Sequence, residues 1–190
     1  MTMLILGLVV FLGVHSTAFV SPGFRVRAVA RLGEGGWKVL YAVVSLVGFV
    51  LLVRGFAEAR EAPIVLYTPP HWMHHVTFLL MLPVFPLILA AYLPGRIKAA
   101  MKHPMLAAVK FWALAHLLSN GTLADVLMFG GFLAWAVLDR ISFKRRPPQR
   151  IVTAPARAFN DVLAVVVGLG LYGFFIAWAH QRLFGVSPLG

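Results

Sequence analysis

Long apolar stretches separated by short polar segments dominate the hydrophobic pattern of this chain. Six such stretches lie at residues 2–20, 37–54, 71–93, 104–119, 122–138 and 159–180. A helix needs about 20 apolar residues to cross a hydrocarbon core of ~30 Å, and the fourth stretch is short for this, with a rise of only roughly 23 Å. The pattern predicts an all-α integral membrane bundle of six transmembrane helices, forming a single domain over residues 1–190.

Turn-forming residues mark several boundaries of these stretches. Ser-Pro-Gly at 21–23 ends the first stretch, and Thr-Pro-Pro at 68–70 has the pattern of an N-cap with proline in the first turn of the third span. Asn-Gly at 120–121 predicts a tight turn. Thr122 and Asp125 follow with the spacing of a capping box, so the fourth and fifth spans should form a helical hairpin.

Glycine and proline predict three irregular regions. Three glycines should interrupt any continuous helix over residues 24–38: Gly33, Gly35 and Gly36. Two prolines should kink the third span: Pro83 and Pro86. In the last span, three glycines offer a smooth surface for internal helix packing or for a homodimer: Gly168, Gly170 and Gly173.

The composition excludes a soluble domain. Of 190 residues, 61% are hydrophobic and 12% charged, which is more apolar surface than a soluble fold of this length could bury. The net charge of +11 arises mainly in the loops after the first, third and fifth spans, so it indicates membrane orientation rather than nucleic-acid binding. With these loops in the cytoplasm, both termini should be periplasmic, and we expect a multi-pass protein of a bacterial inner (cytoplasmic) membrane.

Charged and aromatic residues near the span ends have expected roles. The most basic loop, 139–157, should lie against anionic lipid; its cations are Arg140, Lys144, Arg145, Arg146, Arg150 and Arg157. Arg54 and Glu58, one turn apart, should form a weak solvated ion pair. Tyr41 is placed like an interfacial anchor.

Residues 103–121, HPMLAAVKFWALAHLLSNG, carry polar chemistry on an apolar helix. Positions three or four apart share a helix face, so Trp112, His116 and Asn120 line one stripe. An ionisable group inside a span is costly and marks a candidate functional site. The alternative is a neutral His116 that hydrogen-bonds a neighbouring helix. Lys110 should snorkel to the cytoplasmic side, or pair with Asp161 or a cofactor carboxylate.

Other histidines provide further candidates. His15 lies inside the first span, in GVHSTAF, where it either serves a site or reaches toward the headgroups from the helix end. The third span opens with HWMHH, in which His71, His74 and His75 have metal-ligand spacing and match the H-x-x-H-H box of membrane di-iron desaturases. The alternative is an interfacial His/Trp group. On the six-span topology His74 and His75 lie at the depth of His116.

The absence of cysteine limits the cofactor chemistry. The chain can form no disulfide, no iron–sulfur cluster and no thiolate-ligated haem. Histidine is therefore the main soft ligand, with methionine in reserve.

The 103–121 stretch resembles the NnrU family, whose members carry a similar HPML…WALAHLLxNG run, and GVHSTAF in the first span fits the same pattern. The likeness covers most of the chain. The family is similar to the plant zeta-carotene isomerases, membrane proteins that use a b-type haem, and NnrU itself is associated with denitrification and nitric oxide metabolism.

The resemblance implies that the protein binds haem b, with His15 and His116 at the matching ligand positions. Trp112, Asn120 and Lys110 would line the cofactor. In upright helices the backbones of His15 and His116 differ in depth by roughly 15 Å, which keeps His75 and His74 open as alternative partners of His116.

Three classes of function follow. A haem protein with two imidazole ligands suits electron transfer with a respiratory or electron-donor membrane partner, or gated chemistry as an isomerase or oxidoreductase acting on a polyene or nitric oxide. A non-enzymatic membrane factor that assists assembly or regulation of a respiratory complex is the second class. A non-haem iron enzyme that uses His71, His74 and His75 is the third.

Overall fold

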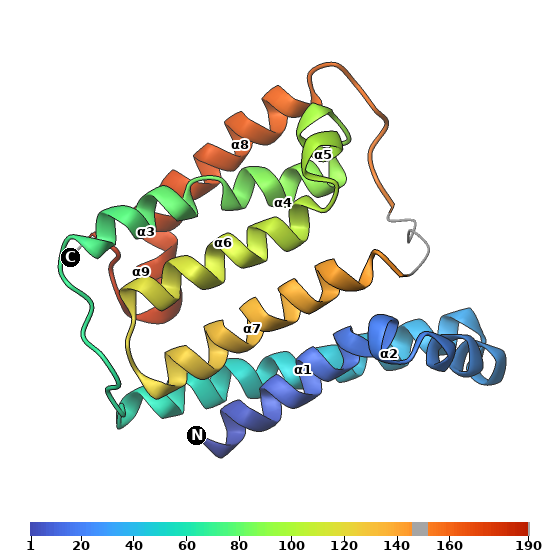
Figure 1. Cartoon of the computed structure of the whole chain (residues 1–190), viewed down its shortest axis with the longest axis horizontal. Coiled ribbons are helices and arrows are strands. Elements are labelled where there is room, and N and C mark those ends of the chain that lie inside the picture. The colour runs from blue at the N-terminus through green and yellow to red at the C-terminus, as the bar shows by residue number, and fades with distance from the viewer. Residues whose placement is uncertain (146–151, 190) are drawn as a thin grey trace. The chain divides into compact units, whose positions relative to one another are not determined.

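The computed structural model describes residues 1–145 and 152–189 (Figure 1). In chain order its elements are α1 (Thr2–Val20), α2 (Pro22–Glu61), α3 (Met73–Met81), α4 (Val84–Tyr92), α5 (Arg96–Met101), α6 (Pro104–Ser119), α7 (Leu123–Ser142), α8 (Asn160–Phe174), the π-helix η1 (Phe175–Ala179) and α9 (His180–Phe184). No β-strand forms within the described ranges, so the all-α prediction is confirmed for them.

Several of these helices are suited to a bilayer. Within the described residues, four helical segments are long and apolar enough to cross a membrane: Thr2–Val20, Gly23–Glu61, Met73–Tyr92 and Asn160–Phe184. α6 is apolar but only 16 residues long. α7 has 20 residues and carries Asp125, Asp139 and Arg140. The chain is a multi-pass membrane protein by these features; six spans with periplasmic termini remain a prediction.

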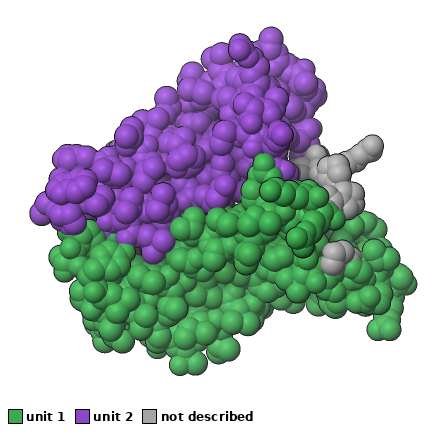
Figure 2. All heavy atoms as spheres, viewed as in Figure 1, with its two compact units in different colours: residues 1–69, 120–147 green, residues 70–119, 148–190 purple. Residues whose placement is uncertain are grey.

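The chain divides into two compact units that are each discontinuous in sequence (Figure 2). Unit 1 contains residues 1–69 and 120–147, and unit 2 contains residues 70–119 and 148–190. α1, α2 and α7 therefore belong to unit 1. The remaining helices belong to unit 2.

Close backbone packing of α1 against α2 organises unit 1. A Cβ atom on Gly48 would lie 2.8 Å from the backbone nitrogen of Phe11, and one on Gly7 would lie 2.5 Å from that of Leu52. Since Gly7 faces Leu52 while Phe11 faces Gly48, the two helices run antiparallel. Gly55 approaches the backbone of α1 in the same way. Small residues permit such close contact where the surrounding lipid provides no hydrophobic driving force.

The basic segment 24–38 is helical, which corrects the sequence prediction. α2 runs through it, and only Gly33 has non-helical angles, with φ 72° and ψ 166°. A glycine within a helix costs only about 1 kcal/mol, so the other two glycines stay helical. Glu34 forms ion pairs on both sides of this kink, with Arg25 at 3.2 Å and Lys38 at 3.1 Å from its carboxylate oxygens.

Residues that follow α2 pair with the turn that precedes α7. The N–H groups of Leu66 and Tyr67 donate to the carbonyl of Gly121 at 2.8 and 3.1 Å. The Tyr67 hydroxyl donates to the Asn120 carbonyl at 2.7 Å. We call residues 64–67 and 120–123 the clasp. The clasp joins the segment after α2 to the start of α7.

The predicted capping box is confirmed at the start of α7. The Thr122 hydroxyl accepts from the backbone N–H of Asp125, while the Asp125 carboxylate accepts from the backbone N–H of Thr122 at 3.0 Å. By contrast, residues 68–70 do not cap a helix. α3 begins at Met73, with Trp72 in the N-cap position and no side-chain cap, because the Pro-Pro pair favours extended backbone where the chain leaves the clasp.

Unit 2 is built on the broken helix α3–α4, which packs against α6 and α8. The break falls between Met81 and Val84, as the prolines predict. A Cβ on Gly168 would lie 2.5 Å from the backbone nitrogen of Pro86, so α8 lies directly on α4. Such an atom on Gly170 or Gly173 would meet nothing within 4 Å. The close-packing surface expected of this helix is therefore formed by Gly168.

Asp161 holds the short helix α5 instead of pairing with Lys110. Its carboxylate accepts from the backbone N–H groups of Arg96 at 2.7 Å and Ile97 at 3.0 Å. The buried side chain of Asn160 adds a bond to the Pro94 carbonyl at 2.8 Å. An Asp161–Lys110 ion pair, the sequence-based alternative to snorkelling, is absent from the ion pairs of the described residues.

The start of α6 and the end of α7 each show a feature that the sequence did not predict. α6 begins at Pro104, two residues after Lys102, whose φ of 59° is strained for a residue with a side chain. α7 continues to Ser142, past the predicted end at 138. Two cations predicted for the following loop, Arg146 and Arg150, lie outside the described residues.

Candidate functional site

His15 lies on α1 with one ring nitrogen fixed by its own helix. Its Nδ1 lies 2.7 Å from the carbonyl oxygen of Phe11. Because a carbonyl oxygen only accepts, Nδ1 carries a proton, and the tautomer that makes this bond has its lone pair on Nε2. Metal-ligating histidines are commonly anchored in this way, with the second nitrogen offered to the metal.

Aromatic rings from all three helices of unit 1 surround His15. The ring centroid of Phe11 lies 4.3 Å from that of His15, Tyr41 on α2 lies at 5.4 Å, and Trp135 on α7 lies edge-on at 6.3 Å. Tyr41 therefore contacts the histidine, whereas the sequence suggested only an interfacial anchor. Apolar aromatic surroundings with a few polar groups are typical of ligand sites.

Asp139 is a buried carboxylate on the same side of unit 1 that the sequence analysis missed. Its residue is 9% exposed, one helical turn beyond Trp135 on α7. It lies within electrostatic range of Tyr41. The sequence assigned this residue to a cytoplasmic loop because the apolar run ends at Leu138. Asp139 is four residues from Trp135, and this spacing alone could have indicated that the two side chains share a helix face.

His116 on α6 repeats the arrangement of His15 in unit 2. Its Nδ1 lies 2.9 Å from the carbonyl oxygen of Trp112, so this imidazole also carries its proton on Nδ1 and its lone pair on Nε2. The ring centroids of Trp112 and His116 are 5.5 Å apart. The predicted common face is confirmed for this pair.

The third member of the predicted stripe lies elsewhere. α6 ends at Ser119, and Asn120 belongs to the clasp of unit 1, where its carbonyl accepts from Tyr67. This bond uses the backbone of Asn120, so its predicted place beside a cofactor stays a prediction. Lys110 is half-buried on α6, in unit 2 with Trp112 and His116.

The alternative partners of His116 lie on α3. The Thr77 hydroxyl donates to the Ala115 carbonyl at 3.1 Å, which places the first turns of α3 beside the last turns of α6. His75 therefore lies near the level of His116 along the two helices. The side chains of His74 and His75 are nevertheless exposed.

The three-histidine iron site is not formed. His71 precedes α3, so helical spacing does not apply to it, and its ring centroid lies 5.6 Å from that of His74. In residues 1–145 and 152–189, no group of three or more His, Cys, Asp or Glu side chains could hold a metal ion. The structure therefore gives the non-haem iron hypothesis no support.

A third histidine shares the tautomer of His15 and His116. His180 follows the π-helix η1, and its Nδ1 lies 2.7 Å from the Val186 carbonyl. π-Helical turns inside membrane helices often accompany functional sites. The rings of Phe175 and Phe184 pack on His180, with centroids at 5.9 and 5.0 Å.

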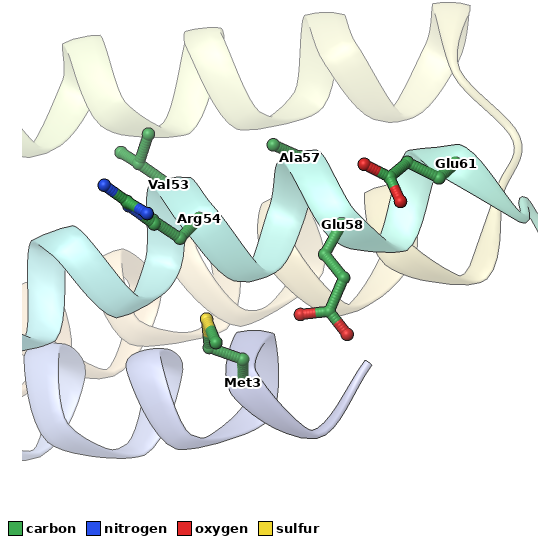
Figure 3. A pocket seen from close by; sticks show the side chains of 6 residues that line it. All are labelled: Met3, Val53, Arg54, Ala57, Glu58 and Glu61. Carbon is green, nitrogen blue, oxygen red and sulfur yellow. The ribbon is translucent and has the colours of Figure 1, made fainter.

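A groove of about 430 Å³ at the other end of unit 1 carries no histidine (Figure 3). It is lined by Met3, Val53, Arg54, Ala57, Glu58 and Glu61. The predicted Arg54–Glu58 pair is not formed: the two side chains diverge in Figure 3, and Glu58 lies 3.9 Å from the N-terminal amine. Glu58 thus pairs with the amine of Met1 instead of with Arg54, because α1 begins beside the end of α2.

The comparison with known families covers almost the entire chain. The family described as NnrU protein matches residues 3–188. The chain belongs to the NnrU family. No curated protein and no solved structure matches it. For this NnrU chain, the family assignment predicted from residues 103–121 and from GVHSTAF is confirmed, and both segments contain a histidine with its lone pair on Nε2.

Proposed function

We propose that this NnrU protein binds haem b in the membrane and that the imidazoles of His15 and His116 would hold it. The observation that carries the proposal is their common hydrogen bond. Each donates from Nδ1 to the carbonyl four residues earlier on its own helix. Each therefore presents Nε2 in the form that ligates iron.

The surroundings of both histidines fit a large apolar cofactor. Phe11 packs on His15, and Trp112 packs on His116. The chain has no cysteine, so imidazole ligation has no thiolate competitor. These residues would orient the imidazoles and exclude water from the porphyrin faces.

Haem held by His15 and His116 would supply one-electron chemistry, and release by one of the two histidines would give access to a small molecule such as nitric oxide or to a polyene double bond. The bonds that orient His15 and His116 would control how readily either imidazole is released. The hydrogen bonds from Nδ1 hold each ring in place. We propose electron transfer or gated chemistry of this kind as the function.

An absorption spectrum of purified protein from haem-supplemented cells, oxidised and reduced, tests the proposal. We expect a Soret band and the sharp α and β bands of low-spin haem. His15→Ala and His116→Ala should each convert the spectrum to a high-spin or haem-free form. His71→Ala, which alters an exposed histidine, is the matched control.

Two results would contradict the ligand assignment. A wild-type protein without a Soret band would exclude haem binding. A low-spin spectrum that survives His15→Ala but is lost in His75→Ala would make His75 the partner. Once haem is shown, nitric oxide binding and zeta-carotene isomerisation in a carotenoid-producing host distinguish the two chemistries.

A further inference from the structure

Two buried hydrogen-bond donors in unit 1 have no acceptor within the described chain. They are the hydroxyl of Ser45 on α2 and the indole N–H of Trp135 on α7. A buried donor without a partner costs about 1–3 kcal/mol. Inside a bilayer, water is not available to relieve this cost.

Trp135 lies directly beside His15. Its ring stands at 87° to the imidazole, with the centroids 6.3 Å apart. The indole edge, which carries Nε1, is the polar part of this side chain.

Ser45 lies at the level of the same histidine. Gly7 faces Leu52 and Phe11 faces Gly48, so the antiparallel register continues to place His15 opposite residue 44. Ser45 is also one helical turn from Tyr41, whose ring contacts His15. The two donors therefore approach the His15 region from two different helices.

Other helical serines in this chain show what a membrane serine normally does. Each donates to a carbonyl of its own helix: Ser16 to Leu12, Ser119 to Ala115 and Ser142 to Asp139. This local bond is the ordinary way to satisfy a hydroxyl in lipid. Ser45 does not form it.

We infer that Ser45 and Trp135 bind an acceptor oxygen of the ligand held at His15, and that for haem this oxygen belongs to a propionate carboxylate. A carboxylate offers two oxygens with several lone pairs and can accept from both donors at once. The inference rests on the proposed haem binding. It adds a carboxylate subsite on α2 and α7 to the imidazole on α1.

Porphyrins with and without carboxylates test the inference. Haem-free protein is titrated with iron protoporphyrin IX and with iron etioporphyrin, which carries only alkyl groups. Trp135→Phe and Ser45→Ala should each weaken binding of iron protoporphyrin IX by about 10- to 100-fold, the loss typical of a hydrogen bond to a charged group. Neither should change the affinity for iron etioporphyrin.

Matched variants control for general effects of the substitutions. Trp178→Phe changes a tryptophan that is 53% exposed. Ser16→Ala removes a hydroxyl that is already satisfied by its own helix. Both should bind the two porphyrins like wild type.

The outcomes separate the two proposals. If wild type binds neither porphyrin, haem binding itself fails. If wild type binds both, and Trp135→Phe and Ser45→Ala bind iron protoporphyrin IX as tightly as wild type, the carboxylate subsite is refuted while haem binding stands. Equal losses for both porphyrins would also refute it, since the effect would then be on packing.

Discussion

The carbonyl oxygen of Tyr67 occupies the space where a side chain on Gly121 would begin. The same glycine accepts the backbone N–H of Tyr67 through its own carbonyl at 3.1 Å. This approach of two backbones explains why the Asn-Gly pair ends the conspicuous 103–121 stretch. The glycine serves the closure of unit 1 between the end of α2 and the start of α7.

Gly121→Ala should destabilise the protein by about 1–3 kcal/mol, because the added methyl collides with backbone that cannot rotate away. The measurement is thermal unfolding in detergent. Gly170→Ala is the control, since nothing lies within 4 Å of its Cβ position. Equal melting temperatures for Gly121→Ala and wild type would show that the clasp opens at no cost.

Tyr67 should make the clasp sensitive to alkaline pH. Burial, and then the charge of Asp125, raise the pKa of the Tyr67 phenol above its ordinary value. A raised folded-state pKa means that the stabilisation is complete below about pH 10, the unfolded value, and is lost as pH rises through the folded value. The melting temperature of wild type should therefore fall more steeply above pH 10 than that of Tyr67→Phe, which has no proton to lose.

Gly48→Ala should separate α1 from α2. Its methyl would meet the Phe11 backbone at 2.8 Å, and overpacking of this kind costs about 1–3 kcal/mol. Proteolysis and thermal unfolding of the detergent-solubilised protein report the loss. Gly13→Ala, on the open side of α1, should leave stability unchanged or slightly raised.

Asp161→Ala should destabilise the α5 region by about 1 kcal/mol, because two backbone N–H groups lose their acceptor. A double-mutant cycle with Lys110→Met separates this role from an ion pair. The two effects on melting temperature should add. A non-additive effect of the two substitutions would instead show that Asp161 and Lys110 interact.

Asp139→Asn should move the midpoint potential of bound haem to a more positive value. A buried carboxylate within electrostatic range of Tyr41, whose ring contacts His15, would favour the more positively charged ferric state. Redox titration followed at the α band measures the shift. Glu61→Gln, which neutralises an exposed carboxylate in the Figure 3 groove, is the control, and equal shifts in both variants would assign the effect to net charge.

Much of the local structure followed from the order of the residues. The apolar runs predicted the helices, Pro83 predicted the break in the third span, and Thr122 with Asp125 predicted a capping box that is present. The 103–121 stretch and GVHSTAF also predicted the family. These features depend on neighbours along the chain, within a few residues of one another.

Contacts between distant segments were decided only by the tertiary structure. The partner of Asp161 is the α5 backbone, and Asn120 belongs to a clasp with Tyr67. The unpartnered donors of Ser45 and Trp135 could not be recognised before three helices came together around His15. Hydrophobic periodicity determines that a helix exists, whereas helix register and rotation determine which polar atoms meet, and these depend on close packing at glycines such as Gly48.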